Sequence, residues 1–169
     1  MEAINVITES PVHPRDLYLD IVQTNIYLQL SRSQDPRGYL DLASNMLQSA
    51  LKKNPRNIYL ANGCGIVLYR TGKVQQAMNV FKKVRENSLS FISACVNLAH
   101  LHLLEKRYHD ASGLYQTILQ QEGMKTDIQL HLCLALAQMR CGQHGQAQET
   151  LMRVQKLDPT VSVYDDDNQ

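Results

Sequence analysis

ANGCGIVLYRTGKVQQAMNVF is the sequence of residues 61–81, and its three glycines and Gly-Lys pair suggest a phosphate-binding loop. Such a loop requires Gly, four residues, and then Gly-Lys followed by Ser or Thr. Here six residues separate Gly65 from Gly72, and Val74 occupies the position of the metal-binding hydroxyl. A dinucleotide-binding fingerprint fails as well, because Leu68 stands where its third glycine is required. The glycines therefore need a structural explanation.

The explanation is a repeat of about 34 residues, marked by alanines. Ala43, Ala77, Ala111 and Ala147 are separated by 34, 34 and 36 residues. A bulky apolar residue follows each alanine four positions later, and a further apolar residue follows seven positions later. The first set comprises Leu47, Phe81, Tyr115 and Leu151, and the second comprises Ala50, Val84, Ile118 and Val154. Because positions i, i+4 and i+7 share one helix face, each segment is predicted to be an amphipathic helix.

A second helix is predicted before each of these alanines. Small residues recur twelve positions upstream, as Ser31, Gly65, Ala99 and Ala135. Gly72 and Gly142 lie five residues before their alanines, where a tight turn between antiparallel helices needs positive φ. Pro55 and Pro159 mark the exits of the first and last pairs, since proline cannot continue a helix. Each repeat is therefore predicted to be an antiparallel helix pair.

The pattern of small residue, turn glycine, alanine, large apolar residue and proline resembles the tetratricopeptide repeat. The resemblance implies an all-α fold, a right-handed solenoid of about four helix pairs covering residues 17–159. The repeats are expected at about 17–55, 58–89, 92–123 and 128–159. Residues 1–16, which include AINVIT at 3–8, are expected to be an extended or flexible leader, and residues 160–169 an acidic flexible tail. Because Asp35-Pro36 interrupts the first repeat, its helices are expected to differ in length from the family norm.

Composition argues against several classes of function. The formal net charge is +1, which is too small to indicate a surface that binds nucleic acid. The four cysteines form no Cys-x-x-Cys pair, so reduced and mostly buried thiols are expected. No His-Glu-x-x-His motif occurs, and His100 and His102 are too close in sequence to share a helix face. We expect no enzymatic activity, no cofactor, no metal and no membrane span, and an intracellular location.

In tetratricopeptide proteins the first helix of each pair lines a concave groove. The resemblance therefore implies a protein-binding groove made of positions on these helices. They are Tyr59, Asn62, Ile66 and Tyr69 in the second repeat, Val96, Asn97, His100 and Leu103 in the third, and Leu132, Leu136 and Met139 in the fourth. This set is largely apolar and has no lysine to clamp the C-terminal carboxylate of a chaperone. We expect it to bind an extended or helical segment of a protein partner, with Asn62, Asn97 and His100 as hydrogen-bonding guides. The alternative for each of these residues is a place in the core between repeats.

Three blocks resemble the tetratricopeptide subunits of RNA polymerase II-associated factor (PAF) complexes. They are NPRNIYLANGCGIVLYRTGKVQQAMNVFKKVRE at 54–86, VNLAHLHLLEKRYHDASGLYQTIL at 96–119 and LALAQMRCGQHGQAQETL at 134–151. The resemblance implies a nuclear scaffold that holds other subunits during transcription elongation and supports chromatin modification. The alternative is a cytosolic peptide-binding adaptor of the co-chaperone or transport type. Because no amphipathic capping helix follows Pro159, we expect the array to continue in a longer protein or to be covered by a partner.

Overall fold

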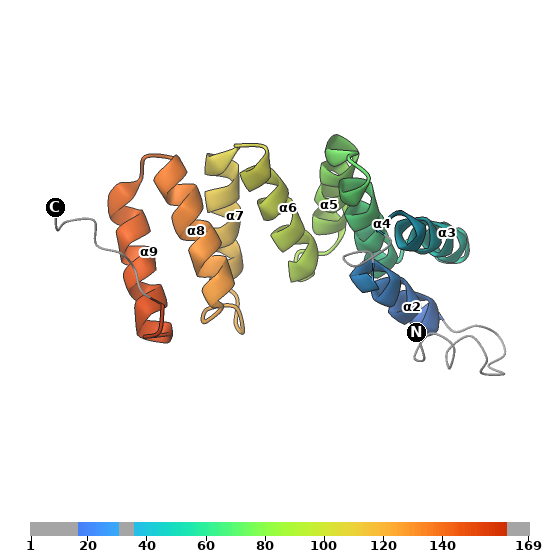
Figure 1. The fold of residues 1–169 in the computed structure, drawn as a ribbon, viewed down its shortest axis with the longest axis horizontal. Coiled ribbons are helices and arrows are strands. Elements are labelled where there is room, and N and C mark those ends of the chain that lie inside the picture. The colour runs from blue at the N-terminus through green and yellow to red at the C-terminus, as the bar shows by residue number, and fades with distance from the viewer. Residues whose placement is uncertain (1–16, 31–35, 162–169) are drawn as a thin grey trace. The chain divides into compact units, whose positions relative to one another are not determined.

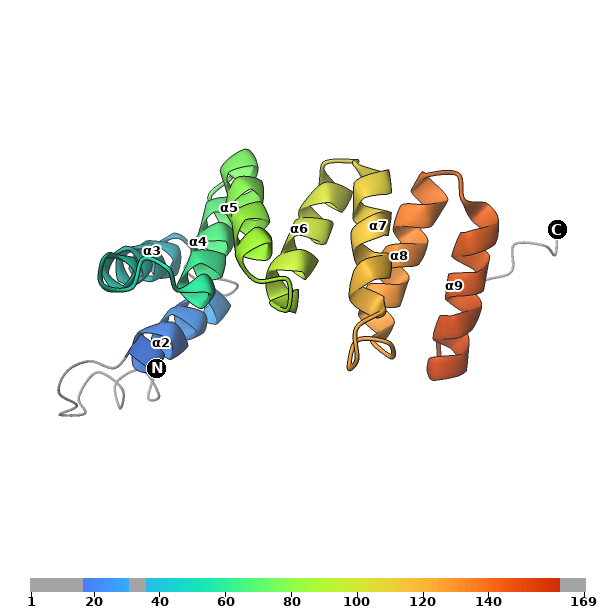
Figure 2. The same cartoon turned by 180° about the vertical axis from the view of Figure 1, so that it is seen from behind.

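A computed structural model describes residues 17–30 and 36–161, and within these ranges the chain consists of eight α-helices without strands. The predicted all-α class is confirmed (Figures 1 and 2). The chain forms two compact units, Met1–Ala94 and Cys95–Gln169. Ser31 and the predicted leader lie outside the described residues, and so does the tail from residue 162 onwards.

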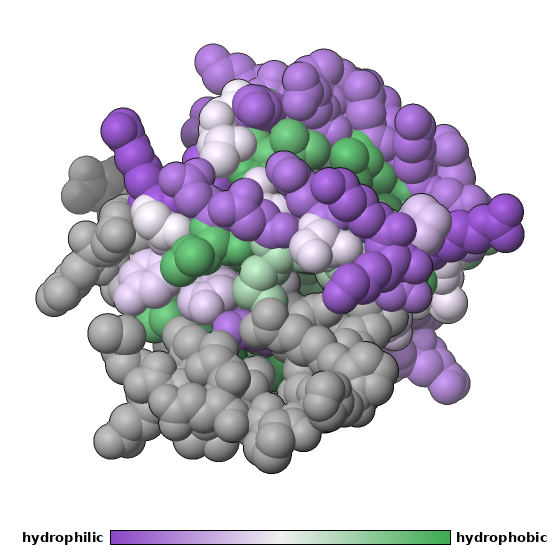
Figure 3. All heavy atoms as spheres, turned by 90° about the vertical axis from the view of Figure 1, so that its right-hand side faces the viewer, coloured by the Kyte–Doolittle hydropathy of each residue, from purple (hydrophilic) through white to green (hydrophobic). Residues whose placement is uncertain are grey.

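The first unit contains α2 (Leu17–Leu30), α3 (Pro36–Lys53), α4 (Ile58–Arg70) and α5 (Val74–Asn87). Here α2 packs against α3 and α4 against α5, while α4 also contacts α3 and, less extensively, α2. The apolar stripe predicted on α3 forms the core, because Ala43, Leu47 and Ala50 are all buried. Helix α3 has 18 residues, whereas α5 has 14, so the second helix of the first repeat is indeed longer. Seen from the side where α2 and α3 lie, hydrophobic residues occupy a seam between hydrophilic ones (Figure 3).

Gly65 sets how closely α4 and α5 approach each other. A Cβ atom added at this glycine would lie 2.4 Å from Cε1 and 2.7 Å from Cζ of the Phe81 ring. The ring is buried, and it therefore has little freedom to move aside. Gly65 is the small residue at the helix crossing, as the sequence predicts. Close packing at this contact is possible only without a side chain on α4.

Gly63 has a similar role between successive helix pairs, which the sequence analysis did not assign. A Cβ atom at Gly63 would lie 3.0 Å from Cδ2 of Leu47 on α3. Because these two glycines have no side chains, α4 packs closely against α5 on one side and against α3 on another. The Asn-Gly-x-Gly run of residues 62–65 is therefore a packing motif.

The second unit contains most of α6 (Ile92–Leu104), together with α7 (Tyr108–Leu119), α8 (Ile128–Arg140) and α9 (His144–Leu157). Helix α8 packs against both α7 and α9. The repeat positions again form the core, since Ala111, Tyr115, Ala147 and Val154 are buried. Leu151 is only half-buried, unlike its counterparts at the same repeat position.

Among the described residues, three turns that join the helices of a pair share one geometry. Gly72, Lys106 and Gly142 have φ values of 80°, 60° and 76°, in the left-handed region. In each turn the next residue donates its amide to the carbonyl five residues earlier, as Arg107 does to His102 at 2.8 Å. This pattern is the Schellman cap that ends a helix. The prediction for Gly72 and Gly142 is confirmed, whereas Lys106 adopts the same conformation without being glycine. Gly38, at the aligned position of the first repeat, lies inside α3 instead.

Replacing Gly65 with alanine should destabilise the first unit because the new methyl group meets a buried aromatic ring. We expect the free energy of unfolding to fall by about 1–3 kcal/mol, the usual cost of overpacking. Gly63→Ala should cost less, since it meets the end of a leucine side chain. Gly113→Ala is the control, because an added Cβ on α7 meets nothing within 4 Å and alanine favours helix by about 0.5–1 kcal/mol. Urea unfolding followed by circular dichroism measures all three, and an unchanged Gly65→Ala midpoint would contradict the packing argument.

Lys106→Gly should stabilise the protein, by up to about 1 kcal/mol, because glycine adopts a positive φ without the steric cost that lysine bears. Gly142→Ala makes the opposite change in the equivalent turn and should destabilise by a similar amount. Thermal unfolding of both variants gives the measurement. A lower melting temperature for Lys106→Gly would show that the lysine side chain, rather than its backbone, matters in this turn.

Candidate protein-binding surfaces

The first candidate surface lies on α4 in the first unit. Asn57 caps this helix, its side-chain oxygen accepting a hydrogen bond from the Leu60 amide at 3.0 Å. The predicted groove residues on α4 follow helical spacing and share one face, but they differ in exposure. Tyr59 and Tyr69 are 57% and 40% exposed, so both rings are accessible near the two ends of the helix.

The two residues between these tyrosines are less accessible. Asn62 is only 9% exposed, and Ile66 packs against the core cluster that includes Leu47 and Leu60. Contact of α4 with α2 and α3 accounts for this burial. Asn62 was expected to guide a partner by hydrogen bonding, but its side chain is buried within the unit.

Tyr59 has an aromatic neighbour that the sequence analysis did not include. Its ring lies 5.0 Å from that of Phe91, centroid to centroid, with an interplanar angle of 76°. Edge-to-face contact of this kind stabilises an aromatic pair beyond the area that it buries. Leu89, in the same linker as Phe91, is strongly exposed. Tyr59, Leu89 and Phe91 thus place apolar surface beside the start of α4.

The second candidate surface lies on α6, where Val96, Asn97, His100 and Leu103 are all half-buried. His100 has an internal partner, because its Nδ1 shares a hydrogen bond with the hydroxyl of Tyr115 on α7. The Tyr115 hydroxyl also interacts with the Cys133 thiol on α8. The Tyr115 hydroxyl therefore links three helices of the second unit, and His100 takes part in this link in addition to its expected role as a guide for a partner.

Burial controls the ionisation of this polar link. Burial raises the pKa of the Tyr115 phenol, and Cys133 raises it further. Burial also raises the pKa of the Cys133 thiol, although the hydrogen bond from Tyr115 lowers it in part. The pKa of His100 is lowered by burial. All three groups are therefore favoured in their neutral forms, as expected for polar groups that lie among apolar side chains.

The third candidate surface lies on α8. Asp127 caps the helix by accepting a hydrogen bond from the Leu130 amide at 3.0 Å, as Asn57 does on α4. Leu132 is half-buried, whereas Leu136 and Met139 are exposed. Two exposed apolar side chains one turn apart offer a small hydrophobic contact surface.

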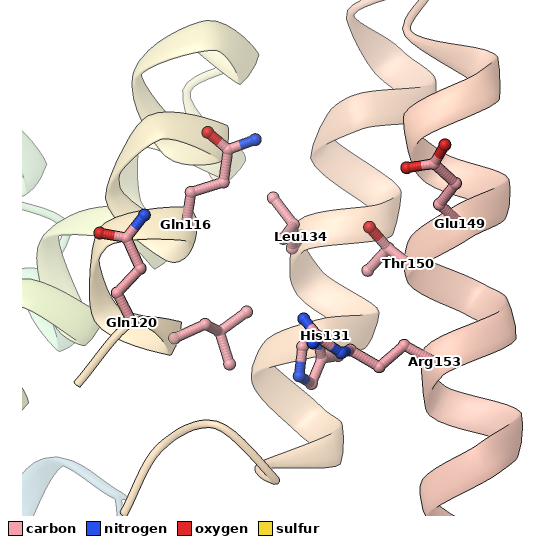
Figure 4. A pocket seen from close by; sticks show the side chains of 8 residues that line it. Gln116, Gln120, His131, Leu134, Glu149, Thr150 and Arg153 are labelled. Carbon is pink, nitrogen blue, oxygen red and sulfur yellow. The ribbon is translucent and has the colours of Figure 1, made fainter. Parts of the chain in front are cut away.

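A pocket on the second unit was not predicted from the sequence. It has a volume of about 480 Å³ and lies between α7 and α9, with α8 behind it (Figure 4). Side chains from all three helices line it, namely Gln116, Leu119, Gln120, His131, Leu134, Glu149, Thr150 and Arg153. Sequence reasoning missed it because these residues follow no motif and converge only through packing.

The described residues hold no group of three or more His, Cys, Asp and Glu side chains that could bind a metal ion. The four cysteines are free thiols, with Cys95 buried and the other three half-buried. Within residues 17–30 and 36–161, no helix has the length and hydropathy needed to span a membrane.

Comparison with known structures supports the repeat fold. The structure resembles that titled MamA AMB-1, with a TM-score of 0.67 and 18% identity, over 96% of this chain and 84% of that one. It is equally similar to a tetratricopeptide repeat protein from Parabacteroides merdae, with a TM-score of 0.67 and 19% identity, over 82% and 55% of the two chains. Residues 128–161 match the tetratricopeptide repeat family model. The chain therefore has the fold of tetratricopeptide repeat proteins, and residues 128–161 form a repeat of this family.

Its sequence relatives narrow this class. The RNA polymerase-associated protein CTR9 of Caenorhabditis elegans is 32% identical over 120 residues, which is 71% of this chain and 10% of that protein. The CTR9 homolog of Arabidopsis thaliana is 31% identical over 127 residues, which is 72% of this chain and 12% of that one. The RNA polymerase-associated protein CTR9 of Saccharomyces cerevisiae is 29% identical, over 63% of this chain and 11% of that protein. Among tetratricopeptide proteins, the chain thus resembles CTR9, and it spans about a tenth of the length of these relatives.

The His100 link predicts how stability depends on pH. Because burial lowers the pKa of His100 below its usual 6.5, the unfolded chain binds a proton more readily than the folded one. The stability that neutral His100 gives the folded chain is complete above a pH of about 6.5. It is lost as the pH falls through the lower pKa that His100 has in the folded state. We expect His100→Gln to lose less stability between pH 7.0 and 5.5 than the unaltered chain does. Urea unfolding at both pH values tests this, with the exposed His109→Gln as the matched substitution; equal losses in the two variants would contradict it.

Proposed function

We propose that this chain is a non-enzymatic scaffold segment of the tetratricopeptide subunit of an RNA polymerase II-associated factor complex. In this proposal it holds other subunits during transcription elongation, supports chromatin modification and acts in the nucleus. The observation that carries the proposal is the similarity to CTR9 proteins from an animal, a plant and a yeast, over most of the chain. Two of these relatives are named as RNA polymerase-associated proteins.

The proposed mechanism is apolar docking onto preformed helices. Tyr59 and Tyr69 on α4, and Leu136 and Met139 on α8, keep accessible apolar surface. Schellman caps end both helices, and side-chain caps begin them, so these residues are held on rigid elements before a partner binds. Preorganisation reduces the entropy lost on binding, and aromatic anchors contribute most where they become fully buried. The predicted groove residues include no lysine, which disfavours a chaperone carboxylate as the bound group.

Affinity purification tests the proposed complex. The full-length protein that contains this chain, tagged and purified from nuclear extract, should recover RNA polymerase II and its associated factors, identified by mass spectrometry. Recovery of chaperones without polymerase-associated subunits would instead support a cytosolic adaptor and overturn the proposal.

A double substitution on α4 tests the surface in the same experiment. Tyr59→Ala with Tyr69→Ala removes two accessible rings, and we expect each loss to weaken partner binding by about 1–2 kcal/mol. Because both residues are exposed and neither belongs to the buried core, helix content by circular dichroism should stay unchanged. Met152→Ala on α9 is the control, as it removes an exposed apolar side chain away from the predicted groove. If the double variant retained its partners as well as the control does, α4 would not be the binding surface.

A further inference from the structure

The positive charge of the chain is concentrated in the first unit. Among its described residues, this unit has nine lysines and arginines but only three aspartates and glutamates. The described part of the second unit has six of each kind. The overall net charge of +1 conceals this difference. An excess of one sign over part of a molecule attracts oppositely charged partners to that part.

The segment that joins α3 to α4 carries three of these cations. Lys52 and Lys53 end α3, Arg56 follows in the loop, and all three side chains are exposed. Within the described part of the chain, no carboxylate forms an ion pair with any of the three. A hollow of about 400 Å³ lies here, lined by Lys53, Asn54, Pro55, Arg56 and Asn57. Because the lining includes two cations and no acidic residue, the hollow favours a negatively charged ligand.

Neither the repeat nor the helix end accounts for all three cations. One repeat later, the aligned residues at 86, 87 and 90 are Glu, Asn and Ser, so the packing of helix pairs does not require positive charge at these positions. Lys52 and Lys53 lie in the last turn of α3, where positive charge suits the helix dipole. Arg56 lies beyond the end of α3 and has no such role. Its charge, together with that of Lys53 in the same hollow, indicates a function in binding.

Accessible apolar surface lies beside this hollow. Tyr59, in the first turn of α4, follows Arg56 by three residues, which span at most about 11 Å. The Tyr59 ring is 57% exposed and contacts the Phe91 ring edge-to-face. Leu89, two residues before Phe91, is 75% exposed. A partner that binds at the hollow can therefore also cover aromatic and aliphatic side chains.

This combination favours a polypeptide over a nucleic acid. Single-stranded nucleic acid binds where its bases stack on open aromatic faces and its phosphates pair with cations. Here the rings of Tyr59 and Phe91 meet at an interplanar angle of 76°, and the exposed side chain beside them is the aliphatic Leu89. An acidic segment of a polypeptide supplies carboxylates for Lys53 and Arg56, and it also supplies an apolar side chain to cover Leu89.

We propose that the hollow at the α3–α4 loop, with the apolar surface beside it, binds an acidic segment of a partner polypeptide. Carboxylates of the segment pair with Lys53 and Arg56, and the arginine guanidinium donates two hydrogen bonds to one carboxylate. A neighbouring aliphatic or aromatic side chain packs on Tyr59 and Leu89. Exposed ion pairs are individually weak, so several acidic residues and the apolar contact act together. The inference does not depend on membership of an RNA polymerase-associated complex, and it adds the chemistry of a partner to the groove proposal.

Selection from a phage-displayed library of random dodecapeptides on the purified 169-residue chain tests the proposal. The enriched peptides should carry several aspartates or glutamates next to a large aliphatic or aromatic residue. A fluorescein-labelled copy of the best peptide is then titrated with the protein, with fluorescence anisotropy as the readout. Replacing its acidic residues by their amides, or its large apolar residue by glycine, should raise the dissociation constant at least tenfold. Enrichment of neutral or basic peptides, or no enrichment, would overturn the proposal.

Single-stranded RNA tests the alternative ligand. A labelled oligouridylate with as many negative charges as the selected peptide should bind at least tenfold more weakly than the peptide does. The reason is that it offers no aliphatic side chain to Leu89, which is strongly exposed. Equal or tighter binding of the RNA would assign the hollow to nucleic acid and contradict the proposal.

Matched variants locate the binding. Lys53→Gln with Arg56→Gln alters exposed residues only, so the fold should persist, and the dissociation constant of the peptide should rise at least tenfold. Lys73→Gln with Lys156→Gln removes the same charge from exposed positions outside the hollow and should change it less than twofold. Leu89→Ala, which removes the exposed aliphatic contact, should weaken binding more than this control does. Equal binding by both double variants, or by Leu89→Ala and the unaltered chain, would rule out this site.

Discussion

The contact between Gly65 and the ring of Phe81 is the constraint on which the first unit depends. With a hydrogen atom in place of a side chain, α4 lies directly against the ring of the buried Phe81. Gly63 allows the same close approach to Leu47 on α3. These two contacts fix the rotation of α4 about its axis. That rotation leaves Tyr59 and Tyr69 accessible and buries Asn62, so the packing of two glycines determines what the surface presents.

In the second unit the corresponding constraint on helix packing is a set of hydrogen-bonded polar side chains rather than a contact at a glycine. Tyr115 is fully buried, and a buried hydroxyl must find hydrogen-bond partners. It finds them in His100 on α6 and Cys133 on α8. A residue predicted to face a partner thus also supports the core. Because His100 belongs both to the candidate surface on α6 and to this polar link, a change at that surface also affects the packing of the helix pair. The candidate surface on α4 has no such polar link to its neighbours.

The repeat could be predicted because its signals are local. The alanines recur at helical crossings, all four are buried, and the turn glycines at 72 and 142 have the positive φ that their positions require. Other features had no local signal. Lys106 adopts a glycine conformation because the cap geometry of its turn overrides the preference of its side chain. Asn62 has the spacing of a surface residue but is buried by contacts of α4 with helices that are distant in sequence.

The sequence by itself determined the helical class, the period of the repeat, the small residues at helix crossings and the resemblance to CTR9. These properties follow from spacing along one chain, since helix geometry converts residue number directly into a shared face. Only the tertiary structure decided which of the predicted groove residues remain accessible, and which side chains of three helices line a pocket in the second unit. Exposure and hydrogen-bond satisfaction depend on side chains brought together from separate helices, and no spacing along the chain specifies those contacts.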